Sequence, residues 1–177
     1  MRDALRELGF TVPTDLNVPA ELRDGEEIAL LEIDASAGCV AESAYLSLQR
    51  RIEADFLKSG KRRKGIIVVN GERLSDPNVR KQPYSDTLRN ACDNFGYTLI
   101  TGDALFALVS YALERREDSQ HEHANGPDAG LLADIRATIL ETDGLLIVEE
   151  TDDDGSSLAQ KDESLEAVSG SDDISET

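Results

Sequence analysis

The sequence predicts an α/β fold with a mixed central sheet flanked by helices. From residue 1 to 150, apolar side chains alternate between short runs typical of strands and stripes spaced by three or four residues, typical of helices. Gly or Asp-Gly separates most of these segments, as expected at helix ends and turns. We therefore expect one domain, residues 1–150, followed by a different kind of segment at residues 151–177.

The first half of the domain is predicted element by element. Residues 2–8 form one or two helical turns that end at Gly9, and residues 28–34 form a strand that begins after the Asp24-Gly25 turn. Residues 40–58 form a helix, and residues 65–70 (GIIVVN) form a buried strand that stops at Gly71. The helix is predicted from an apolar stripe made of Tyr45, Leu48, Ile52 and Phe56.

The second half repeats the alternation. Residues 85–95 form a helix closed by Gly96, and residues 97–101 form a short strand. Apolar residues share one face over 103–115 and are spaced by four over 128–141, so both segments predict helices. The polar residues 117–127, which contain Gly and Pro, predict a loop, and residues 145–148 predict a last strand.

Charge separates the domain from the end of the chain. The formal net charge is −18, and residues 149–177 hold 11 acids and one base. With few large apolar side chains, residues 151–177 cannot bury enough surface to offset their chain entropy, so we expect a disordered acidic tail. So acidic a chain repels nucleic-acid phosphates unless a local basic face overrides the mean charge.

Composition also bounds the location. No apolar run is long enough to span a membrane, and no secretory signal is present. Cys39 and Cys92 make neither a disulfide framework nor a zinc site, so a cytoplasmic location is expected. Five lysines against 13 arginines in an acid-rich chain further suggest a halophilic source.

Two carboxylates share one face of the strand at residues 28–34. Alternation directs Ala29, Leu31 and Ile33 to one face. Glu32 and Asp34 leave the opposite face, roughly 6–7 Å apart. Because burying unpaired carboxylates is costly, they must reach solvent at a strand end or share a cation.

The spacing of these acids resembles a known motif. Pro13-Thr14-Asp15, 16 residues and then Glu32-Ile33-Asp34 resemble the PD-(D/E)xK motif of the restriction-endonuclease-like nuclease superfamily. The resemblance implies a Mg²⁺-dependent endonuclease with Asp15, Glu32 and Asp34 as its catalytic acids. It implies that Asp15, Glu32 and the Ile33 carbonyl bind the Mg²⁺, with Asp34 as an outer ligand. Carboxylate oxygens suit this hard cation, which polarises phosphate and activates water.

Further segments resemble the same superfamily over about residues 2–148. They are residues 4–10, which resemble the end of its first helix, the strand 64–70 with Arg73, Arg80, Pro83 and Tyr84 after it, residues 99–106 and residues 142–144. Two departures stand against these matches. The first helix is truncated, and Asp34 replaces the Lys that helps to activate water, which predicts impaired or lost cleavage.

A basic stretch supplies the predicted nucleic-acid contacts. Residues 50–89 hold 11 bases and five acids. We expect phosphate contacts beside the carboxylates from Arg50, Arg51, Lys61, Arg62, Arg63 and Lys64. The alternative is that this run is a solvated turn between a helix and a strand. Arg50 or Arg51 could replace the missing family Lys only in part, because an arginine stabilises charge but is a poor proton acceptor.

Three function classes therefore stay open. The first is a nuclease-related domain that acts on DNA. The second is a non-catalytic interaction module of the same fold that binds a protein partner. The third is a doubly wound domain with a small ligand at the carboxyl ends of its strands, near Asn70 and Thr101.

Overall fold

The computed structural model describes residues 1–15, 20–76, 79–121, 129–148 and 160–161. Within these residues, strands and helices alternate largely as predicted. The elements are α1 (Arg2–Glu7), β1 (Glu21–Asp24), β2 (Glu27–Asp34), α2 (Ser43–Ser59), β3 (Lys64–Val69), α3 (Asp86–Phe95), β4 (Thr98–Thr101), α4 (Gly102–His121), α5 (Ala129–Glu141), β5 (Gly144–Ile147) and β6 (Gln160–Lys161).

The strands form one mixed sheet in the order β1-β2-β3-β4-β5-β6. Strands β2 to β5 are parallel, whereas β1 and β6 pair antiparallel with their neighbours. The predicted α/β class with a mixed central sheet is therefore confirmed. A doubly wound sheet binds its ligand where the strand order reverses. The described strands follow one another without a reversal, so the doubly wound alternative is wrong.

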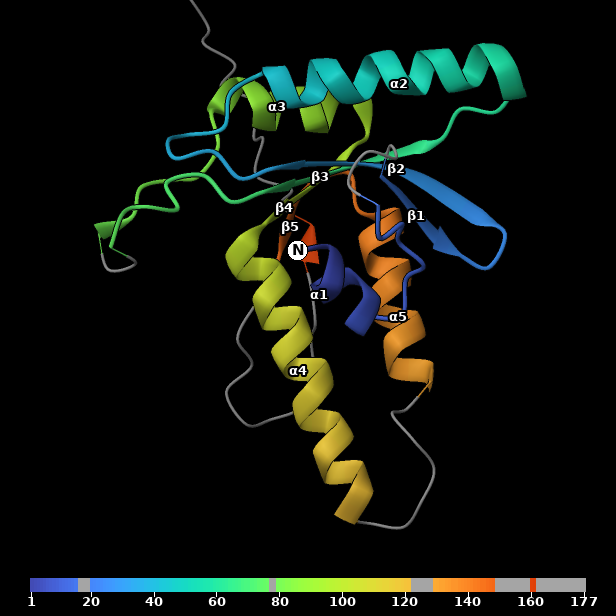
Figure 1. Cartoon of the computed structure of the whole chain (residues 1–177), viewed down its shortest axis with the longest axis vertical. Coiled ribbons are helices and arrows are strands. Elements are labelled where there is room, and N and C mark those ends of the chain that lie inside the picture. Colours follow the sequence, from blue (N-terminus) through green and yellow to red (C-terminus); the bar gives the residue numbers. More distant parts are fainter. Residues whose placement is uncertain (16–19, 77–78, 122–128, 149–159, 162–177) are drawn as a thin grey trace, which may run out of the picture.

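Helices cover both faces of the sheet (Figure 1). α2 and α3 lie on one face, and α1, α4 and α5 lie on the other. Each face has its own buried apolar core. The first core includes Leu48, Ile67, Leu88 and Leu99, and the second includes Leu5, Leu31, Val68, Leu108 and Ile139.

Local chemistry explains the helix ends that were predicted. The Ser85 side chain accepts a hydrogen bond from the Leu88 amide at 3.2 Å and caps the start of α3. Gly60 and Gly96, at φ of +68° and +66°, end α2 and α3 in the left-handed conformation that glycine adopts without strain.

The structure differs from the sequence predictions in several places. Strand β1 at Glu21–Asp24 was not predicted. α4 continues to His121, so the loop prediction is wrong for residues 117–121, where no Gly or Pro interrupts the helix. Phe56, predicted within the apolar stripe of α2, is 48% exposed. The rest of the predicted loop lies outside the described residues.

The predicted acidic tail also lies outside the described residues, except for Gln160–Lys161. These two residues pair with Leu146 and Ile147 of β5. None of the helices in the described ranges is long and apolar enough to cross a membrane.

Candidate metal and nucleic-acid site

Strand β2 directs Glu32 and Asp34 to the face covered by α2. Ala29 and Leu31 lie in the core under α1, α4 and α5, whereas Leu30 lies in the core under α2 and α3. The predicted alternation along this strand is therefore confirmed, and both carboxylates leave the face that α2 covers.

Arg51 of α2 holds the Glu32 carboxylate. Its Nη1 donates to Glu32 Oε2 at 3.0 Å and to the Leu31 carbonyl at 2.8 Å. Its Nη2 donates to the Ala20 carbonyl, just before β1, at 2.8 Å. The Arg51 and Glu32 side chains are only 26% and 25% exposed. One guanidinium thus ties α2, β2 and the start of β1 together.

Asp34 lies at the carboxyl end of β2 and organises the turn that follows. Its carboxylate accepts hydrogen bonds from the Ser36 amide, at 3.0 Å, and from the Ser36 hydroxyl. Its carbonyl accepts from the Asn70 amide at 2.8 Å, which joins the ends of β2 and β3. Each carboxylate thus avoids unpaired burial, since Glu32 is paired with the Arg51 guanidinium and Asp34 lies at the end of the strand.

Asp15 lies in the segment before β1 and its residue is exposed. The Asp15 carbonyl accepts from Arg2 Nη1 at 2.8 Å, and the Pro13 carbonyl accepts from Arg2 and Arg6 at 3.0 and 3.1 Å. α1 therefore anchors this segment through its backbone.

The described residues hold no group of three or more His, Cys, Asp or Glu side chains placed to bind a metal ion. The structure thus does not gather Asp15, Glu32 and Asp34 into a shared cluster. Ile33 pairs with Val68 in the sheet, and its side chain packs against the core under α1, α4 and α5. Ligation of Mg²⁺ by Asp15, Glu32 and the Ile33 carbonyl stays a prediction.

The basic run at residues 61–64 lies at the opposite end of the sheet from Asp34. In the β2–β3 register, Lys64 is next to Ala29 and Val69 is next to Asp34. Five residues of strand separate them, or roughly 16 Å. The α2 crossover returns the chain to the amino end of the next parallel strand, so the run begins β3 whereas Asp34 ends β2. Phosphate contacts by this run beside the carboxylates stay a prediction.

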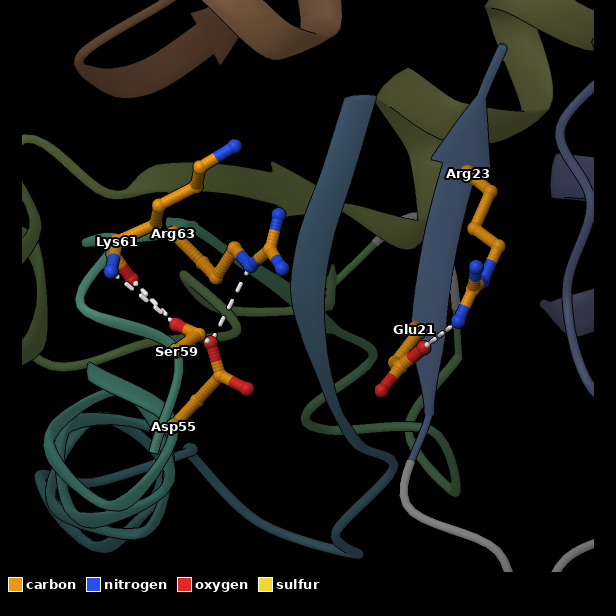
Figure 2. Close-up of polar contacts among 6 residues, drawn as sticks. All are labelled: Glu21, Arg23, Asp55, Ser59, Lys61 and Arg63. Atoms are coloured by element: carbon orange, nitrogen blue, oxygen red, sulfur yellow. Dashed lines mark hydrogen bonds and ion pairs between the residues drawn. The ribbon is translucent and has the colours of Figure 1, made fainter. Parts of the chain in front are cut away.

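Contacts within the protein occupy part of the basic run. Arg63 Nε donates to Asp55 at 3.2 Å, and Ser59 contacts the Lys61 backbone (Figure 2). The same view shows the Arg23–Glu21 pair of β1. Lys64 Nζ donates to Asp143 and to the Thr142 carbonyl, both at 2.7 Å.

Three of the six bases expected to contact phosphate are exposed. They are Arg50, Lys61 and Arg62. A hollow of about 290 Å³ at this end is lined by residues 61–64, but Glu26 and Glu27 line it too, so its charge is mixed. Nucleic-acid contacts by these bases stay a prediction.

The sequence did not reveal a second, smaller pocket on the α2 face. It has a volume of about 150 Å³ and is lined by Gln49, Ile52, Glu53, Phe56, Arg62 and Tyr97. The apolar stripe that includes Ile52 and Phe56 was the available signal, but a stripe does not show whether its last residue is covered.

Comparison of the chain with protein-family models, with curated proteins and with solved structures gave no match.

Proposed function

We propose that this chain is a nuclease-related domain of the restriction-endonuclease-like type that does not cleave nucleic acid and serves as an interaction module for a protein partner. The order helix, antiparallel strand pair, helix and parallel strand from α1 to β3 agrees with the resemblance. So does the position of Glu32 near the carboxyl end of β2.

The Arg51–Glu32 pair is the observation that carries the proposal. A Mg²⁺ ion bound by Glu32 would lie next to the fixed positive charge of the guanidinium, and this repulsion disfavours the metal. Arg51 cannot take a proton from the attacking water, because a guanidinium does not lose its own proton in proteins. It therefore cannot replace the family Lys as a base. Asp34, in the position of that Lys, is bound to Ser36. The contacts of Glu32, Arg51 and Asp34 thus all support a structural role for these residues.

Exposed apolar side chains on α2 support the proposal of a protein partner. Leu46, Phe56 and Leu57 of α2 are 38%, 48% and 84% exposed. Phe56 and Leu57 are adjacent, and α2 covers this face of the sheet together with α3 (Figure 1). Neighbouring large apolar groups on a surface are typical of protein interfaces.

Plasmid cleavage tests the proposal. The full chain, Glu32→Gln and Arg51→Gln are incubated with supercoiled plasmid and Mg²⁺ or Mn²⁺, with Glu114→Gln, an exposed acid of α4, as the matched control. We expect no nicking beyond a protein-free blank by any variant. Metal-dependent nicking by the natural chain and Glu114→Gln, lost in Glu32→Gln, would overturn the proposal and support catalysis instead.

A further inference from the structure

The pocket between α2 and Tyr97 has the size of a small organic group. Its volume of about 150 Å³ is that of a cavity that takes a benzene ring. Pockets for cofactors and drug-sized ligands are roughly two to six times larger. Its occupant is therefore one ring or one branched chain with a small polar head.

Apolar groups form one side of this pocket. Ile52 is 3% exposed, and Phe56 is 48% exposed at the rim. The Tyr97 ring stacks on Phe95 with 5.7 Å between centroids. Gly65 makes room for that ring, because a Cβ there would approach Tyr97 Cδ1 to 2.6 Å. The pocket is thus built into the contact between α2 and the sheet.

Two donors of the pocket have hydrogens that the fold leaves unused. Tyr97 is 2% exposed, and among the described residues its hydroxyl makes no hydrogen bond of ordinary geometry. The Arg62 guanidinium lies close to that hydroxyl and donates towards its oxygen, so the hydroxyl proton itself still has no acceptor. Arg62 has no ion pair with any other residue that the structure describes. A buried hydroxyl proton and a guanidinium without a carboxylate favour a ligand that brings an acceptor.

The local charge favours an anion. Residues 53–63 hold four bases and two acids in a chain of net charge −18. The two acids are already engaged, since Asp55 pairs with Arg63 and Glu53 accepts from the Gln49 amide at 3.2 Å. Glu53 nevertheless lies in the pocket and repels an anion, so it lowers the affinity of the site.

We propose that this pocket binds a small monocarboxylate with an apolar body of one ring or one branched chain. The carboxylate accepts hydrogen bonds from Arg62 and from the Tyr97 hydroxyl. The apolar body lies against Ile52 and Phe56. This inference does not depend on the proposed interaction module, because it concerns a pocket and a ligand that the module does not require.

Calorimetric titration of 3-phenylpropionate into the full chain tests the site. We expect saturable binding with a Kd of about 1 mM or below. Two probes separate the contributions to affinity: 3-phenylpropanol has the body without the charge, and acetate has the charge without the body. Both should bind at least about tenfold more weakly.

Variants then assign the binding to this pocket. Arg62→Gln should weaken binding by about tenfold or more, and Tyr97→Phe by several-fold. Glu53→Gln should tighten it, and Lys61→Gln, an exposed neighbour, is the matched control that should weaken it by less than about twofold. Circular dichroism confirms that each variant is folded.

Three results would overturn the site. The first is no binding of 3-phenylpropionate up to about 10 mM. The second is equal binding of the alcohol and the acid. The third is an equal loss of affinity in Lys61→Gln and Arg62→Gln, which would mean diffuse attraction rather than a pocket.

Discussion

Replacing Arg51 with methionine should lower the free energy of unfolding by about 2–4 kcal/mol. The change removes three hydrogen bonds of a charged donor, to the Glu32 carboxylate and to the Leu31 and Ala20 carbonyls. It also leaves a carboxylate that is only a quarter exposed without its cation. Charge-assisted bonds contribute about 1.5–3 kcal/mol each, but partial exposure screens the pair, so the estimate stays well below their sum.

Urea unfolding followed by circular dichroism measures this loss. Arg50→Met is the matched control, because Arg50 is exposed on the same helix and should change stability by less than about 0.5 kcal/mol. In Glu32→Gln the amide oxygen still accepts from Arg51, so that variant should lose only about 1 kcal/mol. Arg51→Met and Glu32→Gln combined should lose less than the sum of the two single changes.

The reasoning fails if Arg51→Met is as stable as Arg50→Met. Arg51 would then contribute no more than an exposed arginine. Glu32 would be available to a metal ion at little cost in stability.

Three further predictions concern the α2 face. Tyr97→Phe should raise the free energy of unfolding by about 1 kcal/mol, since it removes a buried hydroxyl whose proton has no acceptor; a loss of stability in urea unfolding would mean that the contact of the hydroxyl with Arg62 outweighs this cost. Gly65→Ala should lower it by about 1–3 kcal/mol, because the new Cβ would lie within 2.6 Å of Tyr97 and 2.9 Å of Leu48. Gly38→Ala, with its nearest contact at 4.0 Å, is the control and should be near neutral in the same assay. Burial raises the pKa of the Cys92 thiol from 9.0 to about 12, with Asp93 adding to the shift and Lys64 opposing it. Iodoacetamide at neutral pH should therefore modify exposed Cys39 and leave Cys92 intact by mass spectrometry.

The sign of the Cys92 effect on stability follows from the same shift. Above pH 9.0 the unfolded chain releases the thiol proton before the folded chain does. Stability should therefore fall as the pH rises from 9.0 towards about 12, and Cys92→Ala should flatten that slope. An unchanged slope in urea unfolding would show that this thiol is not the group responsible.

Most helices and strands could be predicted because neighbouring residues in the sequence determine them. The alternation in β2 is decided by the pleat of one strand, and Ser85, Gly60 and Gly96 act on the helix ends next to them. α4 is longer than predicted because helix ends depend on breakers, and residues 117–121 contain none. The class of fold could thus be predicted before any contact between distant segments was known.

The site needed tertiary information. The sequence required either a strand end or a cation for Glu32, but it could not show that the cation is a side chain 19 residues away. The contiguous bases at residues 61–64 suggested one phosphate-binding edge. The fold instead places them at the amino end of β3 and ties Arg63 and Lys64 to Asp55 and Asp143.

Calorimetric titration of Mn²⁺ into the natural chain, beside Glu32→Gln, tests the central claim that Glu32 is a structural carboxylate. Weak binding to so acidic a surface is common to both proteins, so the difference between the two isotherms is the measured quantity. We expect identical isotherms if Glu32 stays paired with Arg51 and does not bind the metal ion. A saturable site present in the natural chain and absent from Glu32→Gln would contradict the claim.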